Sequence, residues 1–148
     1  EVPYKFLTRG RIFDYEPHNI ENFVRPYCVE CDLVIFPEIK EIKQCPECLR
    51  ENTFIYDFLL MIEDGHGSEL PTLVNGRDAV RFLNGILPTK VMQEETSRQA
   101  FLNLIRKLLA SVIDHGESTE FFEFCVESYY ASDREYRLYK LINTILEI

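Results

Sequence analysis

Apolar and polar residues alternate along several stretches of the chain, and this period of two predicts strands. The pattern is strongest over residues 53–63, where every second side chain is large and apolar and those between are mostly apolar too. The members of the first set are Phe54, Tyr56, Phe58, Leu60 and Ile62. This stretch therefore predicts a central, well-buried strand.

Four other stretches predict strands around it. Residues 4–15 favour a first strand that bends at a bulge near Gly10, followed by a loop over 16–26. A glycine-rich turn at 64–67 leads to a return strand at 69–74, which Pro71 should place partly at an edge. Residues 122–130 alternate again, and after a turn at Ser132–Asp133 a last strand is expected at about 136–145.

Two segments follow a helical period instead. In the shorter one, Asn75 is a candidate N-cap with Asp78 as its reciprocal carboxylate, and Gly85 marks the end. The longer one starts near Thr96, which forms a candidate capping box with Gln99, and stops at His115–Gly116. Its apolar stripe comprises Ala100, Phe101, Leu104, Ile105, Leu108, Leu109, Val112 and Ile113,.

This order predicts a mainly β, α+β fold. Five strands with helices between the third and fourth match the oligonucleotide/oligosaccharide-binding barrel, or OB-fold, and the cysteine-rich segment would then be inserted after the first strand. An open sheet with one packed helix fits the same pattern. The length of 148 residues suits a single domain, 1–148, with no repeat or linker inside it,.

Four of the five cysteines stand in two Cys-x-x-Cys pairs separated by thirteen residues: Cys28, Cys31, Cys45 and Cys48. This spacing is typical of a tetrahedral zinc site rather than of disulfides or of a redox pair, which would accompany a βαβ pattern. Four thiolates leave no position for water, so we expect one structural Zn²⁺ that orders a ribbon at about 27–50. Cys125 stands apart and is expected to be an ordinary thiol.

A net charge of −9 argues against a domain whose main task is to grip a phosphate backbone,. A local basic strip of Lys5, Arg9 and Arg11 remains a candidate contact, although a solvated strand face explains it as well. The tyrosines on the predicted strands also have two interpretations: they could stack on nucleobases, or they could simply pack in the protein. No residue is identified as DNA-binding.

No catalytic constellation is present in the sequence. His18, His66 and His115 fall in a predicted loop, a turn and a helix end, without a second candidate at nucleophile-activating or metal-ligand spacing,. No apolar run approaches the length of a membrane span. We therefore expect a non-enzyme with no small-molecule substrate and no membrane partner.

An apolar cluster lies between the two predicted helices and exceeds what the helix stripes need. It consists of Ile86, Leu87, Val91 and Met92. Pro88 keeps this segment from continuing either helix. Surplus apolar surface of this kind is a candidate groove for a partner peptide, and capping the end of the barrel is the equally good alternative.

Several runs together resemble the C-terminal domain of the protection-of-telomeres family. They are PYCVEC at 26–31, CPEC at 45–48, IEDGHG at 62–67 and FEFCVESYY at 122–130. The cysteine pairs alone also resemble the zinc-bearing C-terminal domain of the largest replication protein A subunit. In vertebrate members of the first family another domain separates the cysteine pairs, so this chain resembles an insert-free form.

The resemblance implies a barrel in a shelterin subunit, located in the nucleus at the telomeric region of chromosomes. It implies docking of the bridging shelterin partner here, with single-stranded telomeric DNA held by other domains and weakly or not at all by this one. The alternative is a single-stranded DNA-binding OB domain of the replication protein A class. A zinc-stabilised scaffold with neither ligand is a third interpretation.

Overall fold

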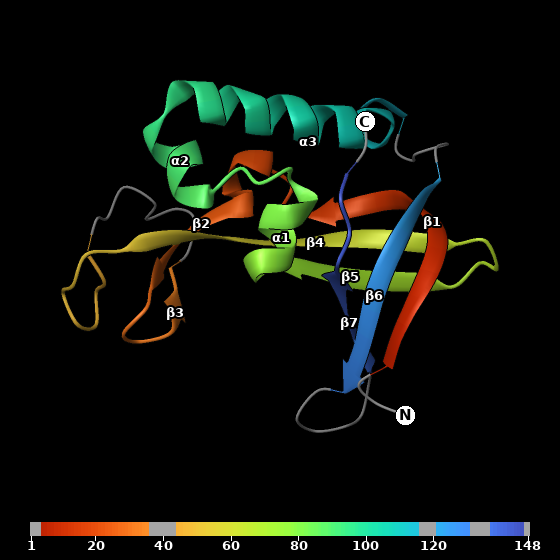
Figure 1. Cartoon of the computed structure of the whole chain (residues 1–148), viewed down its shortest axis with the longest axis horizontal. Coiled ribbons are helices and arrows are strands. Elements are labelled where there is room, and N and C mark those ends of the chain that lie inside the picture. The colour runs from red at the N-terminus through yellow and green to blue at the C-terminus, as the bar shows by residue number, and fades with distance from the viewer. Residues whose placement is uncertain (1–3, 36–43, 116–120, 131–136, 147–148) are drawn as a thin grey trace.

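The computed structural model describes residues 4–35, 44–115, 121–130 and 137–146, so the expected turn at 132–133 lies outside the described residues. Five strands build its centre: β1 (Tyr4–Glu16), β4 (Thr53–Asp64), β5 (Glu69–Asn75), β6 (Phe122–Tyr130) and β7 (Arg137–Ile142). They pair in the order β1-β6-β7-β5-β4, and β4 pairs again with β1 (Figure 1). This closed barrel, with β5 and β7 parallel, is the predicted OB-fold, and the open-sheet alternative is wrong,.

The period of two in β4 places its large side chains inside the barrel, as expected. Tyr56, Phe58, Leu60 and Ile62 are at most 2% exposed. From β6, Phe124 and Val126 meet them, and Phe23 stacks on Phe58 with ring centroids 4.2 Å apart. Burial of these rings and branched chains is the main source of the barrel's stability.

Strand β1 takes part in two different pairings, and the change occurs at Gly10. Residues 4–10 pair with β6, whereas residues 10–16 pair with β4. The irregularity in the ladder lies between Ile12 and Asp14, so the predicted bulge at Gly10 is wrong. Gly10 is needed for a different reason, since a β-carbon there would lie 2.8 Å from the backbone oxygen of Glu63,.

The prediction that Pro71 places this strand partly at an edge is confirmed at Pro71 itself, which pairs with β4 but not with β7. Strand β5 lies between β4 and β7 in the closed barrel. The parallel pairing with β7 involves Thr72 and Leu73 and does not include Pro71, which pairs with Met61 of β4. A residue without an N–H is therefore tolerated because the second ladder begins after it.

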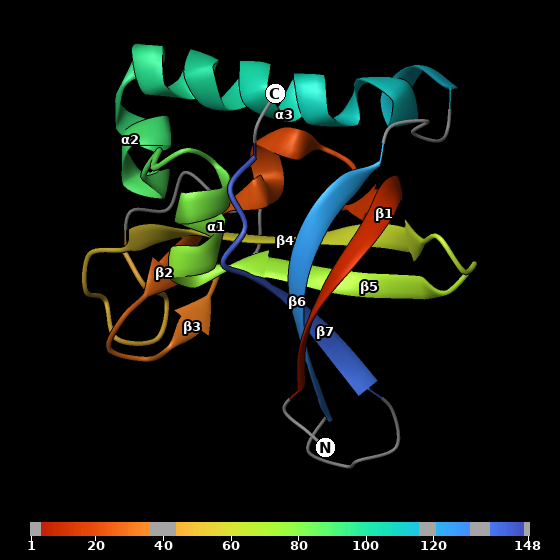
Figure 2. The ribbon, with the colours of Figure 1, turned by 45° about the vertical axis from the view of Figure 1, so that its right-hand side comes forward.

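Three helices connect β5 to β6: α1 (Gly76–Phe82), α2 (Pro88–Gln93) and α3 (Glu95–His115). Helix α3 lies across one end of the barrel (Figures 1 and 2). Its stripe is buried as predicted from Phe101 to Val112, with Leu102 added, while Ala100 and Ile113 are exposed. None of the helices in the described residues has the length and apolar character that crossing a bilayer requires.

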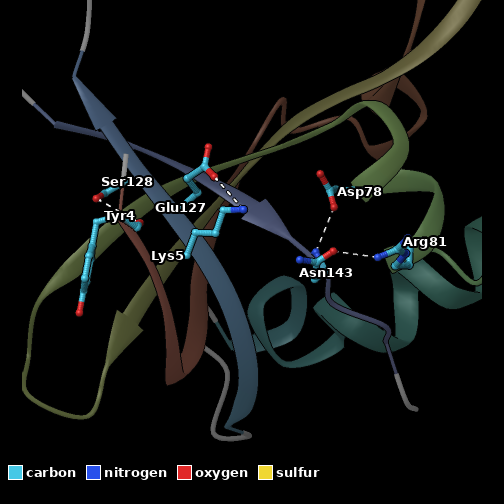
Figure 3. Close-up of polar contacts among 7 residues, drawn as sticks. All are labelled: Tyr4, Lys5, Asp78, Arg81, Glu127, Ser128 and Asn143. Atoms are coloured by element: carbon cyan, nitrogen blue, oxygen red, sulfur yellow. Dashed lines mark hydrogen bonds and ion pairs between the residues drawn. The ribbon is translucent and has the colours of Figure 1, made fainter. Parts of the chain in front are cut away.

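Asn75 is the N-cap residue of α1 as predicted, but its expected side-chain capping is absent, and the capping box predicted for Thr96 and Gln99 is wrong. The side chain of Asn75 makes no cap hydrogen bond, and Asp78 instead accepts a bond from the backbone N–H of Asn143, at 3.0 Å. The side chain of Asn143 accepts a second bond from Arg81 at 2.8 Å, so α1 is tied to the chain just after β7 (Figure 3). Helix α3 begins at Glu95, whose carboxylate accepts a bond from Gln99.

The last strand is shorter than predicted. It ends at Ile142 because Asn143 takes a positive φ of 45°, which turns the chain out of the sheet,. The predicted loop at 16–26 is also shorter, since a 3-10 helix at Ile20–Phe23 leads directly into strand β2 (Val24–Cys28). That strand pairs with the first residues of β4, beyond the barrel, and ends at Cys28, the first residue of the first cysteine pair.

Candidate metal centre and interaction surfaces

The first cysteine pair sits in a tight hairpin. Strand β2 turns back into the short strand β3 (Leu33–Val34), and Cys28 pairs with Leu33. Asp32 closes the turn with a positive φ of 49°, and its carboxylate accepts a hydrogen bond from the hydroxyl of Tyr27 at 2.5 Å. This turn brings Cys31 back beside Cys28.

The second pair forms a similar turn just before β4. The N–H of Cys45 donates to the carbonyl of Arg50, and the N–H of Leu49 donates to the carbonyl of Cys45, both at 2.8 Å. The backbone N–H of Glu47 lies 3.4 Å from the sulfur of Cys45 and donates to it. This is the arrangement in which a knuckle's amides stabilise a thiolate.

The four sulfur atoms converge on one point. The Sγ atoms of Cys28 and Cys48 are 3.5 Å apart, and those of Cys31 and Cys45 are 3.9 Å apart. All four lie within 4.8 Å of one another. In a tetrahedral site with metal–sulfur bonds of about 2.3 Å, neighbouring sulfurs are about 3.8 Å apart. The cysteines are thus placed to bind one metal ion, and none of them is in a disulfide.

Without a metal, the four thiols cannot all lose their protons. The pKa of Cys45 is lowered to about 7, chiefly because the backbone N–H of Cys48 donates to its sulfur. The pKa of Cys31 is raised to about 12, chiefly by its hydrogen bond with the side chain of Cys48. A bound divalent cation would remove this conflict, because each thiolate would then face positive charge.

Among the described residues of this part of the chain, little besides the cysteines is buried. Of the described residues between 27 and 50, only Cys28, Ile35 and Cys45 are buried. An ion pair of 3.2 Å between Arg50 and Glu30 joins the two turns, but it is exposed and contributes little,. A segment whose described residues bury so few apolar side chains is typical of small modules that a bound metal stabilises,.

The apolar cluster proposed for partner binding is divided by the structure. Val91 is only 5% exposed and belongs to the core, and Ile86 is partly buried against it. The hydroxyl of Tyr56 also donates to the carbonyl of Ile86 at 2.6 Å, which anchors this connection to the barrel. Leu87 and Met92 remain exposed, at 48% and 38%. We refer to these two residues, the N-cap Leu87 and Met92 of α2, as the α2 surface.

The predicted basic strip on β1 is matched by acidic residues. Lys5 lies 3.8 Å from Glu127 (Figure 3), and Arg11 lies 3.0 Å from Glu63. Arg9 is opposite Glu123 in the pairing of β1 with β6. Because cross-strand neighbours of opposite charge neutralise one another, this strip does not form a positive surface.

The outer face of β4 and β5 carries acidic side chains, whereas a site that binds nucleic acid needs basic ones. In an OB-fold this is the face on which oligonucleotides bind. Three acidic residues of these two fully described strands share this face, namely Asp57, Glu63 and Glu69, and neither strand contains Lys or Arg. Arg11 of the neighbouring strand β1 pairs with Glu63 at 3.0 Å. Leu59 faces Leu73 and Met61 faces Pro71 across the pair, so the remaining surface is aliphatic rather than aromatic.

No family model matches the sequence, and no curated protein matches it. The fold is similar to that in a crystal structure of fission yeast Pot1 and Tpz1, with a TM-score of 0.63 and 17% identity, over 99% of this chain and 85% of the matched one. It is also similar to a chain of a replication protein A heterotrimer bound to single-stranded DNA, with a TM-score of 0.55 and 15% identity. That match covers 95% of this chain and 31% of the other.

Proposed function

We propose that this chain is a zinc-stabilised, protein-docking OB domain of a telomere end-protection protein. The observation that carries the proposal is the makeup of the β4–β5 face: the two strands place carboxylates and aliphatic side chains there, with no aromatic ring and no cation of their own,. The neighbouring Arg11 is already paired with Glu63. A barrel with this face is better suited to a protein than to a phosphate backbone. Residues 1–148 would form the whole domain.

The resemblance in sequence and the similarity in fold point to the same class of protein. The fission yeast structure contains two proteins, and this chain covers 85% of the matched one. On this basis the docked partner is the bridging shelterin subunit, and the site of action is the telomeric region of chromosomes in the nucleus. Single-stranded telomeric DNA would be bound by other domains, and no catalytic role is proposed.

Zinc is the metal we assign to the four cysteines. Four thiolates in a tetrahedron favour Zn²⁺ over harder cations such as Mg²⁺ and Ca²⁺, which prefer oxygen. Because all four ligands come from the protein, the ion would hold Cys28 and Cys31 against Cys45 and Cys48 and would take no part in a reaction.

The α2 surface is the docking site we propose for the partner. Leu87 and Met92 are exposed apolar side chains at a short helix, whereas their neighbour Val91 is used by the core. An amphipathic segment of the partner would bury both residues.

The deciding experiment is a calorimetric titration of the chain with the purified bridging partner and, separately, with a telomeric single-stranded oligonucleotide at two salt concentrations. Met92→Glu should lower partner affinity by about 2 kcal/mol without changing the melting temperature. Ile113→Glu, an equal change at a residue that is 50% exposed on α3, is the matched control. Sub-micromolar oligonucleotide binding with a steep salt dependence would instead support the replication protein A alternative.

A further inference from the structure

A cavity lies at the end of the barrel that α3 does not cover. The described start of β1 and the end of β6 lie on the side of the barrel away from α3 (Figures 1 and 2). A cavity of about 520 Å³ opens there between the starts of β1 and β5 and strand β7. We call it the barrel-end cavity, and the residues that matter for its chemistry are Tyr4, Phe6, Tyr139, Leu70, Asp64 and Glu69.

Three aromatic rings form one side of this cavity. Tyr4 and Phe6 alternate along β1 onto the same face, and their rings stack with centroids 5.8 Å apart and planes at 24°,. Tyr139 of β7 meets Phe6 edge-on, at 6.5 Å and 88°. Tyr4 is 54% exposed, so a ring face is available to a bound group.

Two carboxylates from the β4–β5 hairpin complete the lining. Asp64 is held in place because its Oδ1 accepts hydrogen bonds from the backbone N–H groups of His66 and Ser68, at 2.8 and 2.9 Å. Glu69 is exposed and pairs across the sheet with Glu63, another acidic residue. The cavity therefore has two negative groups on rigid backbone.

No cation from the described chain lines this cavity. Lys5 is a basic residue next to Tyr4 in the sequence. Its side chain projects from the other side of β1 toward Glu127, away from the ring of Tyr4 (Figure 3). Among the side chains that the structure describes, the lining thus combines aromatic rings and carboxylates without a cation, and such a lining favours a positively charged group,.

We propose that the barrel-end cavity binds a cationic side chain, Arg or Lys, presented by an extended segment of a protein partner. The face of the Tyr4 ring that is not stacked on Phe6 would attract the cation through its π electrons, and Asp64 and Glu69 would neutralise its charge,. A phosphate backbone is disfavoured because its charge has the same sign as the two carboxylates. The site is separate from the α2 surface and does not depend on the function assigned to it.

The test is an NMR titration of the chain that follows the ring signals of its tyrosines and phenylalanines. The probe is acetyl-Gly-Arg-Gly-amide, with acetyl-Gly-Lys-Gly-amide as the second cation and the citrulline analogue as the uncharged isostere. We expect both cationic peptides to shift the signals of Tyr4, Phe6 and Tyr139, and the citrulline peptide to shift them much less. High salt should weaken the effect.

Variants assign the binding to the cavity. Glu69→Gln and Tyr4→Ala, both at exposed positions, should each raise the dissociation constant by roughly threefold to tenfold. Glu123→Gln, the same charge change on the exposed part of β6, should leave it unchanged. Equal shifts from the citrulline peptide, equal losses in the control variant, or larger shifts of the same rings by oligothymidylate would overturn the proposal.

Discussion

Gly10 of β1 and Ile62 of β4 are so close that a β-carbon on Gly10 would lie 2.7 Å from Cγ2 of Ile62. Ile62 is fully buried, and Gly10 is the residue at which β1 leaves β6 and joins β4. The corner at which the barrel closes therefore requires a residue without a side chain.

Replacing this glycine should destabilise the barrel. Gly10→Ala should lower the free energy of unfolding by about 2 kcal/mol, because both the backbone of Glu63 and the core would have to move,. Gly65→Ala is the control, since a β-carbon added at this hairpin position would have no other atom within 4 Å. Urea unfolding of both variants measures the difference, and a Gly10→Ala variant as stable as the control would show that the contact is not tight.

Removing one cysteine of the cluster should cost the metal and the ribbon together. Cys45→Ser removes a buried ligand, so metal content should fall and the amide signals of the ribbon should collapse to unfolded positions,. Zinc binding contributes a free energy on the order of 10 kcal/mol to the folding of small zinc modules, so the ribbon should not refold without the ion. Metal analysis and NMR of the purified chain give the answer.

Cys125→Ser is the matched control for that experiment. The backbone N–H of Cys125, not its sulfur, makes the hydrogen bond to Thr144 at 3.0 Å, so serine preserves the contact. This variant should keep full metal content. If Cys45→Ser also retained its metal and its ribbon signals, the four sulfurs would not be the binding site.

Adjacent residues of α2 should respond oppositely to the same substitution. Val91→Glu places a carboxylate in the core and should lower the melting temperature sharply, whereas Met92→Glu at an exposed position should leave it nearly unchanged,. Thermal unfolding followed by circular dichroism distinguishes them. Equal melting temperatures would mean that α2 does not pack as described.

Asp57 should make the protein less stable as pH rises. Burial raises the pKa of its carboxyl group above the ordinary value of 3.8, and the charge of Arg25 opposes this only in part. A group whose pKa is raised by folding stabilises the native state below its unfolded pKa and loses that contribution as pH rises through its folded pKa.

Asp57→Asn should therefore be more stable than the parent chain at pH 7, with the advantage shrinking as pH falls through the raised pKa of the native carboxyl group and vanishing below about 4,. Urea unfolding of both proteins at several pH values measures the difference between their free energies of unfolding. Effects common to both proteins, such as metal release in acid, cancel in this difference. A difference that grew toward low pH would contradict the direction of the shift.

Local patterns in the sequence were enough to predict the barrel and the metal centre. The period of two from Phe54 to Ile62 marks a strand with one face inside, because side chains alternate whatever the strand packs against. The spacing within each Cys-x-x-Cys pair is likewise a local property, because a single turn brings the two sulfur atoms of a pair together. These features needed no knowledge of distant neighbours.

What the tertiary structure decided is which of several local options each residue uses. Asp78 looks like part of a helix cap but binds Asn143, 65 residues away. Val91 and Met92 are equally apolar, yet only the packing of α2 buries the first and leaves the second exposed. The barrel-end cavity joins Tyr4, Glu69 and Tyr139, which no periodicity could bring together, because closure of the barrel alone sets their distances.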